Sequence, residues 1–397
     1  MILSGEDVTS MVSQLGAFGV AAMRLLPSAN RINNYLTQIS YFEPFFMGVS
    51  DNLQEEINDK NVVYDEAAYR RSKPVDKLPL QDKIVLDDIV YKYPNSDVLI
   101  FDHAHMEIPA GKSVGIVGTS GAGKTTIVDI MLGLLSIQEG HILADGVEVR
   151  DHYESWLKNI GYIPQTIFMI DSTIRKNVAF GYADEDIDDA KVWEALKKAR
   201  LDEFVRSLPE GLDTGIGERG IRISGGQRQR IGIARALAVE PSLIIADEPV
   251  SALDVSIQAQ VLNLLNELKH DLDLTYIFVA HDLSVVEYIS DRVGVMYLGN
   301  FVEVGEKEKI YSNPMHPYTQ ALLSAVPVPD PTAKRERILL EGSIPSAHKP
   351  PTGCKFHTRC PKCMECCKTQ APERYEVDDG HYVYCHLYDK ERREQQK

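Results

Sequence analysis

A glycine-rich segment, Gly118–Thr125, has the sequence GTSGAGKT and matches the pattern G-x-x-x-x-G-K-[ST]. It lies between an apolar stretch typical of a buried strand and a stretch that favours a helix. Backbone N–H groups of such a loop, with the helix start, can hold phosphates; Lys124 would reach the β- and γ-phosphates and Thr125 would hold Mg2+. The alternative is a glycine-rich turn without a ligand, which the flanking strand and helix disfavour. The residues expected around the phosphates are Gly118, Thr119, Ser120, Gly121, Ala122, Gly123, Lys124, Thr125 and Thr126.

Two acids end the apolar run Leu243–Glu248, LIIADE. At the carboxyl end of a parallel strand both side chains would project into the crevice where ligands bind in such sheets. Asp247 would bind Mg2+ through water, and Glu248 would orient or deprotonate the attacking water. Taken alone, the pair could equally be two ordinary acids at a strand end.

The segment Ser224–Gln227, SGGQ, precedes the helix-forming sequence RQRIGIARAL and offers a second set of backbone donors at a helix start. With the two motifs above, it resembles the ATP-binding cassette (ABC) family over about residues 79–325. The resemblance implies that two cassettes pair head to tail. The residues SGGQ of one cassette would then close on ATP held by GTSGAGKT of the other.

The remaining marks of the family follow in order along the chain. By this resemblance, Tyr93 stacks on adenine, Gln165 senses the γ-phosphate and metal, and His281 contacts the γ-phosphate. Asp254 ends the sequence SALD, which communicates between subunits. Read singly, Tyr93 could be a core aromatic, Gln165 a loop amide and His281 an ordinary strand-end histidine, but their joint order favours the family roles.

The expected roles fall into three sets. The catalytic residues are Glu248, His281, Gln165 and Lys124; the other nucleotide contacts are Tyr93, the loop residues named above, Ser224, Gly225, Gly226, Gln227 and Asp254; the Mg2+ ligands are Thr125, Gln165 and Asp247.

The elements that position these residues follow from the hydrophobic pattern. The alternation in IVLDDIVYKYP predicts an antiparallel strand, and short apolar runs between helical stretches predict a largely parallel sheet. The expected strands are 84–94, 113–118, 160–165, 243–248 and 276–282, and the expected helices are 187–208, 227–238 and 255–270. The predicted fold is α/β: a P-loop domain of ABC type with an antiparallel β subdomain and a helical subdomain.

Residues before and after this domain differ in composition. The apolar run Leu15–Met23 is shorter than the roughly 20 residues of a membrane-spanning helix. Residues Leu26–Glu56 read as helical, and the charged, proline-containing stretch Asn58–Leu80 reads as a linker. The expected division is 1–78, a helical remnant of a membrane helix with its linker; 79–325, the ATPase domain; and 326–397, a Cys-rich tail.

Two branches of the family are represented in the chain. Residues 1–223 resemble exporter cassettes, including lipid-linked oligosaccharide flippases, through LLPSANRINNYLTQISY and TGIGERG. In the loop TGIGERG, Glu218 would face membrane subunits. Residues 238–397 resemble the ATPase subunits of oligopeptide and dipeptide importers, through LIIADEPVSALDVSIQAQVLNLL and NPMHPYTQALLSAVPVPDP. Our hypothesis is that two genes were joined within the shared stretch Ser224–Leu237.

All six cysteines lie between Cys354 and Cys385, which excludes a disulfide framework for the main domain. Four of them, Cys354, Cys360, Cys367 and Cys385, match the importer extension, which in the family can bind a [4Fe-4S] cluster. Four thiolates suit either an iron–sulfur cluster or zinc. The alternative is a solvated tail of free thiols.

Composition excludes several classes of protein. The formal net charge is −16, from 58 acidic and 42 basic residues, and residues 79–329 carry most of the excess. Such a surface repels a phosphate backbone, so we expect no nucleic-acid partner. Met1 is followed by ILSGEDVTS, which lacks the basic start of a secretory signal. We expect a peripheral protein on the cytoplasmic face of the cell membrane.

The expected function is ATP hydrolysis that energises oligopeptide or dipeptide import through partner permeases, with a second cassette and a peptide-binding protein as further partners. One alternative is an exporter or flippase cassette for lipid-linked saccharide. A second is a non-functional recombined remnant, and a third is a soluble cassette protein of DNA repair or translation. The third predicts basic arms, tandem cassettes or a long coiled-coil insertion, and the sequence contains none of these.

Overall fold

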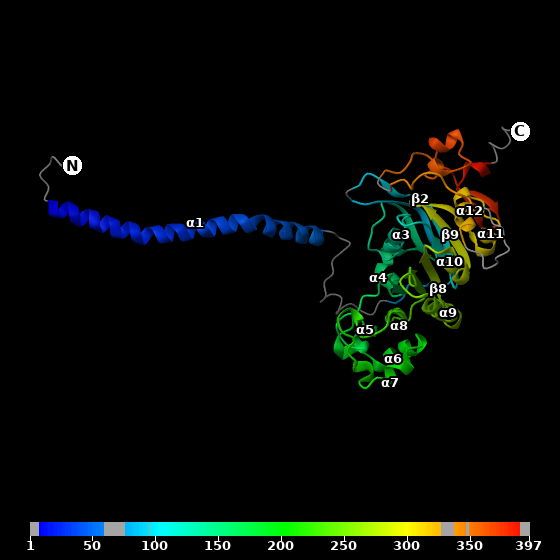
Figure 1. The fold of residues 1–397 in the computed structure, drawn as a ribbon, viewed down its shortest axis with the longest axis horizontal. Coiled ribbons are helices and arrows are strands. Elements are labelled where there is room, and N and C mark those ends of the chain that lie inside the picture. Colours follow the sequence, from blue (N-terminus) through cyan, green and yellow to red (C-terminus); the bar gives the residue numbers. More distant parts are fainter. Residues whose placement is uncertain (1–7, 59–75, 95, 327–336, 347–348, 390–397) are drawn as a thin grey trace. The chain divides into compact units, whose positions relative to one another are not determined.

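The computed structural model describes residues 8–58, 76–94, 96–326, 337–346 and 349–389. The chain divides into two compact units, Met1–Pro74 and Val75–Lys397. Figure 1 draws both units as ribbons. Most of the expected linker, Asn58–Leu80, lies outside the described residues.

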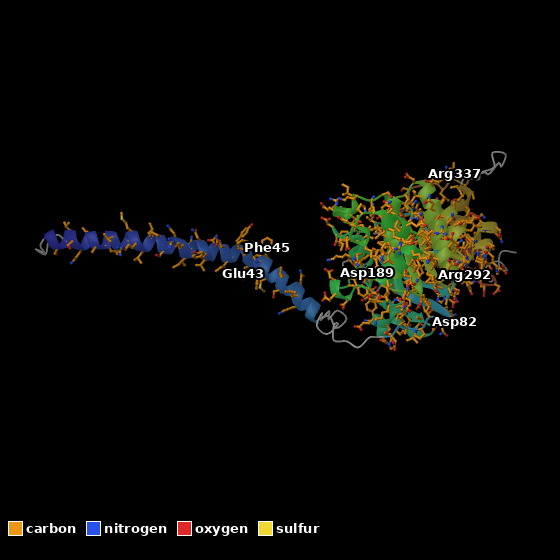
Figure 2. The ribbon with its side chains drawn as sticks, turned by 90° about the horizontal axis from the view of Figure 1, so that it is seen from below. Glu43, Phe45, Asp82, Asp189, Arg292 and Arg337 are labelled. Atoms are coloured by element: carbon orange, nitrogen blue, oxygen red, sulfur yellow. The ribbon has the colours of Figure 1, made fainter. Side chains whose placement is uncertain are left out.

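The described part of the first unit is a single helix, α1 (Val8–Asn58), which continues through Pro27 and Pro44. It begins well before the helical stretch expected from Leu26. Leu15–Met23 contains three alanines, a leucine and a methionine, which favour helix, although its two glycines do not. Side chains stand out on all sides of α1, as Figure 2 shows around Glu43 and Phe45. In the described ranges, no helix is both long and apolar enough to cross a membrane.

The second unit is built on an eight-stranded sheet. Its strands are β3 (Ser113–Val117), β6 (Ile160–Ile163), β7 (Leu243–Asp247), β8 (Thr275–Ala280), β9 (Arg292–Tyr297), β10 (Asn300–Glu306), β11 (Tyr375–Asp378) and β12 (His381–Val383). Their order is β11-β12-β10-β9-β3-β8-β7-β6, and the strands from β9 to β6 pair in parallel. Every residue of β3, β7 and β8 is buried, as expected where both faces of a parallel sheet are covered. The largely parallel sheet is therefore confirmed.

A second sheet of four strands is wholly antiparallel. It contains β1 (Lys83–Lys92), β2 (Leu99–Pro109), β4 (Glu139–Ala144) and β5 (Val147–Glu148), in the order β2-β1-β4-β5. The alternating pattern in IVLDDIVYKYP thus predicted β1 correctly, apart from its last two residues. Since β1 ends at Lys92, Tyr93 stands immediately after the strand.

Helices cover the main sheet and form a separate group at one end of the unit. The α-helices are α3 (Lys124–Met131), α4 (Tyr153–Leu157), α5 (Ile174–Val178), α6 (Asp189–Lys198), α7 (Asp202–Ser207), α8 (Gly225–Ala238), α9 (Val255–Asp271), α10 (Leu283–Ile289), α11 (Lys307–Ser312) and α12 (Pro317–Ser324). Single 3₁₀ turns are η1 (Val149–His152), η2 (Asp184–Asp186), η3 (Gly211–Asp213), η4 (Glu218–Gly220), η5 (His357–Arg359), η6 (Glu365–Lys368) and η7 (His386–Tyr388). In Figure 1, α5, α6 and α7 lie at the end of the unit opposite the C-terminal extension.

The helix expected over 187–208 is two helices, α6 and α7. The break lies at Arg200, whose φ of +53° is outside the helical region. The carbonyl oxygen of Arg200 accepts a hydrogen bond from Arg230 Nη1 at 2.9 Å. A side chain distant in sequence thus satisfies a backbone group at the break, which helix periodicity could not reveal.

The Cys-rich segment joins the main sheet. Strand β12 pairs with β10 and with β11, so the extension adds two strands to the sheet edge. Phe356 and Val383 of this segment are buried, at 1% and 0% exposure. This differs from the separate tail expected from the loss of apolar periodicity, because β11 and β12 are too short to leave a clear pattern.

A buried carboxylate links this extension to the sheet. Glu303 of β10 is 0% exposed, and its Oε1 lies 2.8 Å from His381 Nε2 of β12. The backbone N–H groups of Met315 and His316 donate to the two oxygens of Glu303 at 2.7 and 2.9 Å. His316 Nδ1 accepts from Tyr318 N at 3.0 Å and caps α12. The buried carboxylate is therefore satisfied by partners from two segments, β12 and the residues just before α12.

Candidate functional site: an ATP-binding cavity

The glycine-rich loop connects β3 to α3. Gly121 and Gly123 have φ angles of +75° and +97°, which glycine adopts without strain. A Cβ on Gly118 would lie 2.5 Å from the carbonyl oxygen of Met296, so this position also requires glycine. Gly123 is the N-cap of α3 and offers no side chain to the first N–H groups of the helix. These N–H groups can bind an anion instead.

Lys124 folds back over this loop. Its side chain is 7% exposed, and its ammonium donates to the carbonyl oxygens of Gly118 and Thr119 at 3.0 and 3.2 Å. It lies 3.8 Å from Glu248 Oε1. Burial lowers the pKa of Lys124, and the neighbouring acids Glu248 and Asp247 oppose that shift. Phosphate groups entering here would add the negative charge that a buried ammonium favours.

The end of β7 places the acidic pair opposite the loop. Thr125 Oγ1 donates to Asp247 Oδ2 at 3.4 Å. Asp247 is 5% exposed, and burial, with the charge of Glu248, raises its pKa, although Thr125 and Lys124 act in the opposite direction. A hydroxyl beside a buried carboxylate is a donor set of the kind that Mg2+ uses in phosphate sites. The expected juxtaposition of Thr125 and Asp247 is thus present in the structure.

Glu248 stands at the meeting point of three segments. Its φ is +45°, an uncommon backbone conformation for glutamate, and its N–H donates to Val279 O at 2.9 Å. Its Oε2 accepts a hydrogen bond from Gln165 Nε2 at 3.2 Å and lies 3.1 Å from His281 Nδ1. Gln165 follows β6 and His281 follows β8, so neighbouring strand ends bring these side chains together.

A cavity of about 700 Å³ contains this group and extends to Tyr93. Tyr93 is 40% exposed, its hydroxyl is 3.1 Å from Thr126 Oγ1, and its ring packs edge-on against Tyr91 at 5.2 Å. The complete lining is Tyr93, Ser96, Val98, Ile100, Ser120, Gly121, Gly123, Lys124, Thr125, Thr126, Gln165, Glu248 and His281. The sequence motifs did not indicate Ser96, Val98 and Ile100, for which the only signal was their position shortly after Tyr93.

The SGGQ segment forms the start of α8, as expected. Ser224 and Gln227 form a reciprocal capping box, in which Gln227 N donates to Ser224 Oγ at 3.2 Å and Ser224 N to Gln227 Oε1 at 2.8 Å. A Cβ on Gly226 would be 3.0 Å from Ile257 of α9, so the segment packs against that helix. Asp254 is the N-cap residue of α9. Within the described part of the chain, neither Ser224–Gln227 nor Asp254 lines the cavity that contains Lys124.

Five of the six cysteines are partly or fully buried in the extension, and Cys363 is exposed. Cys354 N donates to Cys367 O at 2.8 Å. Burial raises the pKa of Cys354 to about 12 and of Cys385 to about 11, and each of these thiols is further affected by Cys360 and Cys367. All four expected ligands are therefore neighbours. Across residues 8–58, 76–94, 96–326, 337–346 and 349–389, however, no three Cys, His, Asp or Glu side chains are arranged to hold a metal ion.

Comparisons with known proteins agree with this geometry. Residues 101–251 match the family model described as ABC transporter, and residues 302–367 match the model described as oligopeptide/dipeptide transporter, C-terminal region. The oligopeptide transport ATP-binding protein AppF of Bacillus subtilis is 44% identical over 310 residues, which cover 74% of this chain and 90% of that protein. The chain belongs to the ABC transporter family.

Two further relatives extend the comparison. A Brucella ovis protein, provisionally named a peptide import ATP-binding protein, is 46% identical over 302 residues, covering 74% of this chain and 94% of that protein. Among solved structures, a bacterial Atm1-family ABC exporter with ATP bound is similar, with a TM-score of 0.57 and 30% identity. The match covers 65% of this chain and only 45% of that exporter.

The two comparisons bear on the two branches of the family. The alignment with AppF is longer than the segment 238–397, so similarity to import ATPases extends beyond the importer-like part of the ABC domain. The exporter structure shows that the same domain also resembles the exporter branch.

Proposed function

We propose that this chain is the ATP-binding and ATP-hydrolysing subunit of an ABC transporter that imports oligopeptides or dipeptides. The observation that carries the proposal is the cavity in which Lys124, Thr125, Gln165, Glu248 and His281 converge. AppF, named as an oligopeptide transport ATP-binding protein, supports the substrate class. The match of residues 302–367 to an oligopeptide/dipeptide transporter region supports it further.

Each group of residues in this site would have a separate role in binding ATP and Mg2+. Tyr93 would stack on the adenine, and the loop Gly118–Thr126 with Lys124 would hold the phosphates. Thr125, Gln165 and Asp247 would hold Mg2+, which when bound neutralises charge on the β- and γ-phosphates. The donor set fits this ion, since hydroxyl, amide and carboxylate oxygens are the hard ligands it prefers.

Glu248 would orient the attacking water and accept its proton. A general base must lie within hydrogen-bond reach of its partners, and Glu248 Oε2 is already within that reach of Gln165 and His281. His281 would contact the γ-phosphate on which negative charge develops. Binding of ATP would replace some of these contacts and free the carboxylate to face water.

The cavity of one chain holds only part of the expected site. Ser224–Gln227 and Asp254 are outside its lining, and α8 begins with backbone donors. We therefore propose that these residues act on the nucleotide of a second cassette paired head to tail. ATP would close this pair, and release of the products would open it.

The chain would work with permease subunits and a peptide-binding protein at the cytoplasmic face of the cell membrane, and without a nucleic-acid partner. We propose three functional parts: 1–78, a membrane-helix remnant with its linker; 79–325, the ATPase; and 326–397, the extension. Glu218, in the short turn η4, would face the permease.

The direct test measures phosphate release by the purified full chain and by Glu248→Gln. We expect the variant to lose roughly 10²-fold or more in kcat, the scale of general-base catalysis, while still binding ATP. Glu203→Gln, at an exposed position of α7, serves as the control and should match wild type. Absence of hydrolysis in the wild type, or equal rates in the Glu248 variant, would overturn the enzymatic proposal.

Transport is tested in cells that carry the Glu248→Gln allele. Uptake of a labelled oligopeptide should fall to the level of a deletion strain. The second candidate, export of lipid-linked saccharide, has the similarity to the Atm1-family exporter in its favour. It predicts unchanged peptide uptake and accumulation of the saccharide on the inner side of the membrane.

We also propose that Cys354, Cys360, Cys367 and Cys385 bind an iron–sulfur cluster or zinc. The donor chemistry and shared location of the four thiols support this, whereas their present side-chain arrangement is not a ligand set. No step of the ATPase cycle above depends on it. Metal analysis after anaerobic purification, compared with a Cys360→Ser variant, tests it; the absence of bound iron and zinc in the wild type refutes it.

A further inference from the structure

The two-residue turn Leu298–Gly299 joins β9 to β10 and touches the phosphate loop. Both residues have positive φ, +45° and +81°, as two-residue hairpin turns of this type require. Gly299 N donates to the carbonyl oxygen of Ala122 at 2.8 Å. A Cβ on Gly299 would lie 1.6 Å from Ile100 O, and a Cβ on Gly123 would lie 3.3 Å from the Cα of Gly299. The loop and the turn therefore leave each other little room to move.

The first residue of this turn is in an unfavourable conformation for its type. Positive φ is uncommon outside glycine, asparagine and aspartate, and leucine gains no local hydrogen bond there. Such a conformation persists where surrounding contacts hold it. For Leu298, one such contact comes from the C-terminal extension.

That contact is made by Lys355. Its Nζ donates to the carbonyl oxygen of Leu298 at 3.0 Å and to Oδ1 of Asn300 at 3.0 Å, so a single ammonium binds both sides of Gly299. Hydrogen bonds from a charged donor are stronger than neutral ones. The ammonium thus holds the turn in the conformation that presents Gly299 N to Ala122.

The backbone on both sides of Lys355 is itself fixed. Cys354 N donates to Cys367 O at 2.8 Å. Phe356 is 1% exposed and packs edge-on against Tyr297, with ring centroids 5.2 Å apart. Its ring also lies 5.4 Å from that of Tyr318. Lys355 therefore extends from a rigid base toward the turn.

We propose that Lys355 is a positioning residue for ATP binding, which acts on Ala122 of the phosphate loop through the turn Leu298–Gly299. The inference rests on the proposed function, since it concerns the same nucleotide cavity. It makes the C-terminal extension part of the ATP site, although no residue of the extension lines the cavity within the described part of the chain. Because the turn touches the phosphate loop, loss of the Lys355 ammonium should weaken binding of the phosphates. It should leave the contact with adenine unchanged.

The test uses the full chain and mant-ATP with Mg2+. Lys355→Met keeps most of the side-chain volume and removes the ammonium. We expect a Kd about 3- to 10-fold higher than wild type, the scale of one ordinary hydrogen bond, because the lost contacts act on the phosphate loop only through the turn. Competition by AMP, which lacks the β- and γ-phosphates, should remain unchanged. Lys355→Arg, which retains charged donors, should bind mant-ATP within about 2-fold of wild type.

Lys368→Met is the matched control, because Lys368 lies in the same extension and its exposed side chain pairs with Glu365 at 2.9 Å. It should leave the Kd unchanged. If Lys355→Met does not fold, Lys355→Gln replaces it with the same expectation. A Kd within 2-fold of wild type for the Lys355 variant, or an equal loss for ATP and AMP, overturns the inference. Failure of the wild type to bind mant-ATP would instead refute the proposed function.

Discussion

Oε2 of Glu248 lies 3.1 Å from Nδ1 of His281, so the base expected to activate water is held by the residue expected to contact the γ-phosphate. Replacing His281 by alanine removes a hydrogen-bond donor from the γ-phosphate, where negative charge develops during hydrolysis. We expect kcat for ATP hydrolysis to fall roughly 10²-fold, the effect of removing one such donor, with little change in the Kd of ATP. Steady-state kinetics together with equilibrium nucleotide binding separate these two quantities.

His141→Ala is a suitable control for His281, since His141 contacts Glu148 at 2.7 Å on an exposed part of the antiparallel sheet. Its kinetics should match those of wild type. A His281→Ala variant with kcat within 3-fold of wild type would show that the contact with Glu248 has no role in hydrolysis.

Tyr93 offers a test of adenine recognition. Stacking of a base on an aromatic ring contributes about 1–3 kcal/mol, so Tyr93→Leu should raise the KM for ATP roughly 10-fold. Tyr93→Phe keeps the ring and loses only the hydroxyl that is 3.1 Å from Thr126 Oγ1, so its KM should stay within about 3-fold. Initial-rate measurements with ATP over a range of concentrations distinguish the two. Equal effects of both substitutions would assign the role of Tyr93 to its hydroxyl rather than to its ring.

The pH dependence of stability should depend on His316. Burial lowers the pKa of His316 to about 4 from 6.5, despite the opposing charge of Glu303. Above pH 6.5 neither the folded nor the unfolded chain protonates this ring; as the pH falls toward 4, only the unfolded chain does. Folding should therefore lose stability across this window, by about 3 kcal/mol in total, since one pKa unit corresponds to 1.36 kcal/mol.

The variant that isolates this effect is His316→Asn, because asparagine can still accept the capping bond from Tyr318 N but does not titrate. Urea unfolding at pH 7 and pH 5 should show a smaller loss of stability in the variant than in wild type. Parallel losses in the two proteins would mean that other groups produce the acid sensitivity.

Much of the ATP site could be predicted from sequence because its parts are short motifs at the ends of buried strands. Asp247 and Glu248 end an apolar run, and Gln165 and His281 end two more, so a parallel sheet alone brings these residues together. Residues such as Ser96 and Ile100 have no comparable motif. They reach the cavity because the antiparallel sheet packs next to it, which a linear pattern does not encode.

The contacts of the C-terminal extension could not be predicted from the sequence either. Its cysteine spacing was visible, but the contact of Lys355 with Leu298 depends on the register of the turn between β9 and β10. The pairing of β12 with β10 involves only two residue pairs, too few to produce a periodic signal. Long-range hydrogen bonds of this kind follow from the assembled sheet and not from local composition.

The N-terminal helix should be dispensable for the fold and the nucleotide site. Both hydrophobic cores of the described residues begin at Leu78 or later and include no side chain of α1. Deleting residues 1–74 should therefore leave the Tm of the remaining unit within a few degrees and the Kd of mant-ATP within about 2-fold. Deletion should also reduce self-association, because α1 exposes large apolar side chains such as Phe18, at 75%, and Met23, at 80%. Calorimetry, nucleotide titration and size-exclusion chromatography check the three quantities; a large fall in Tm would mean that α1 stabilises the second unit.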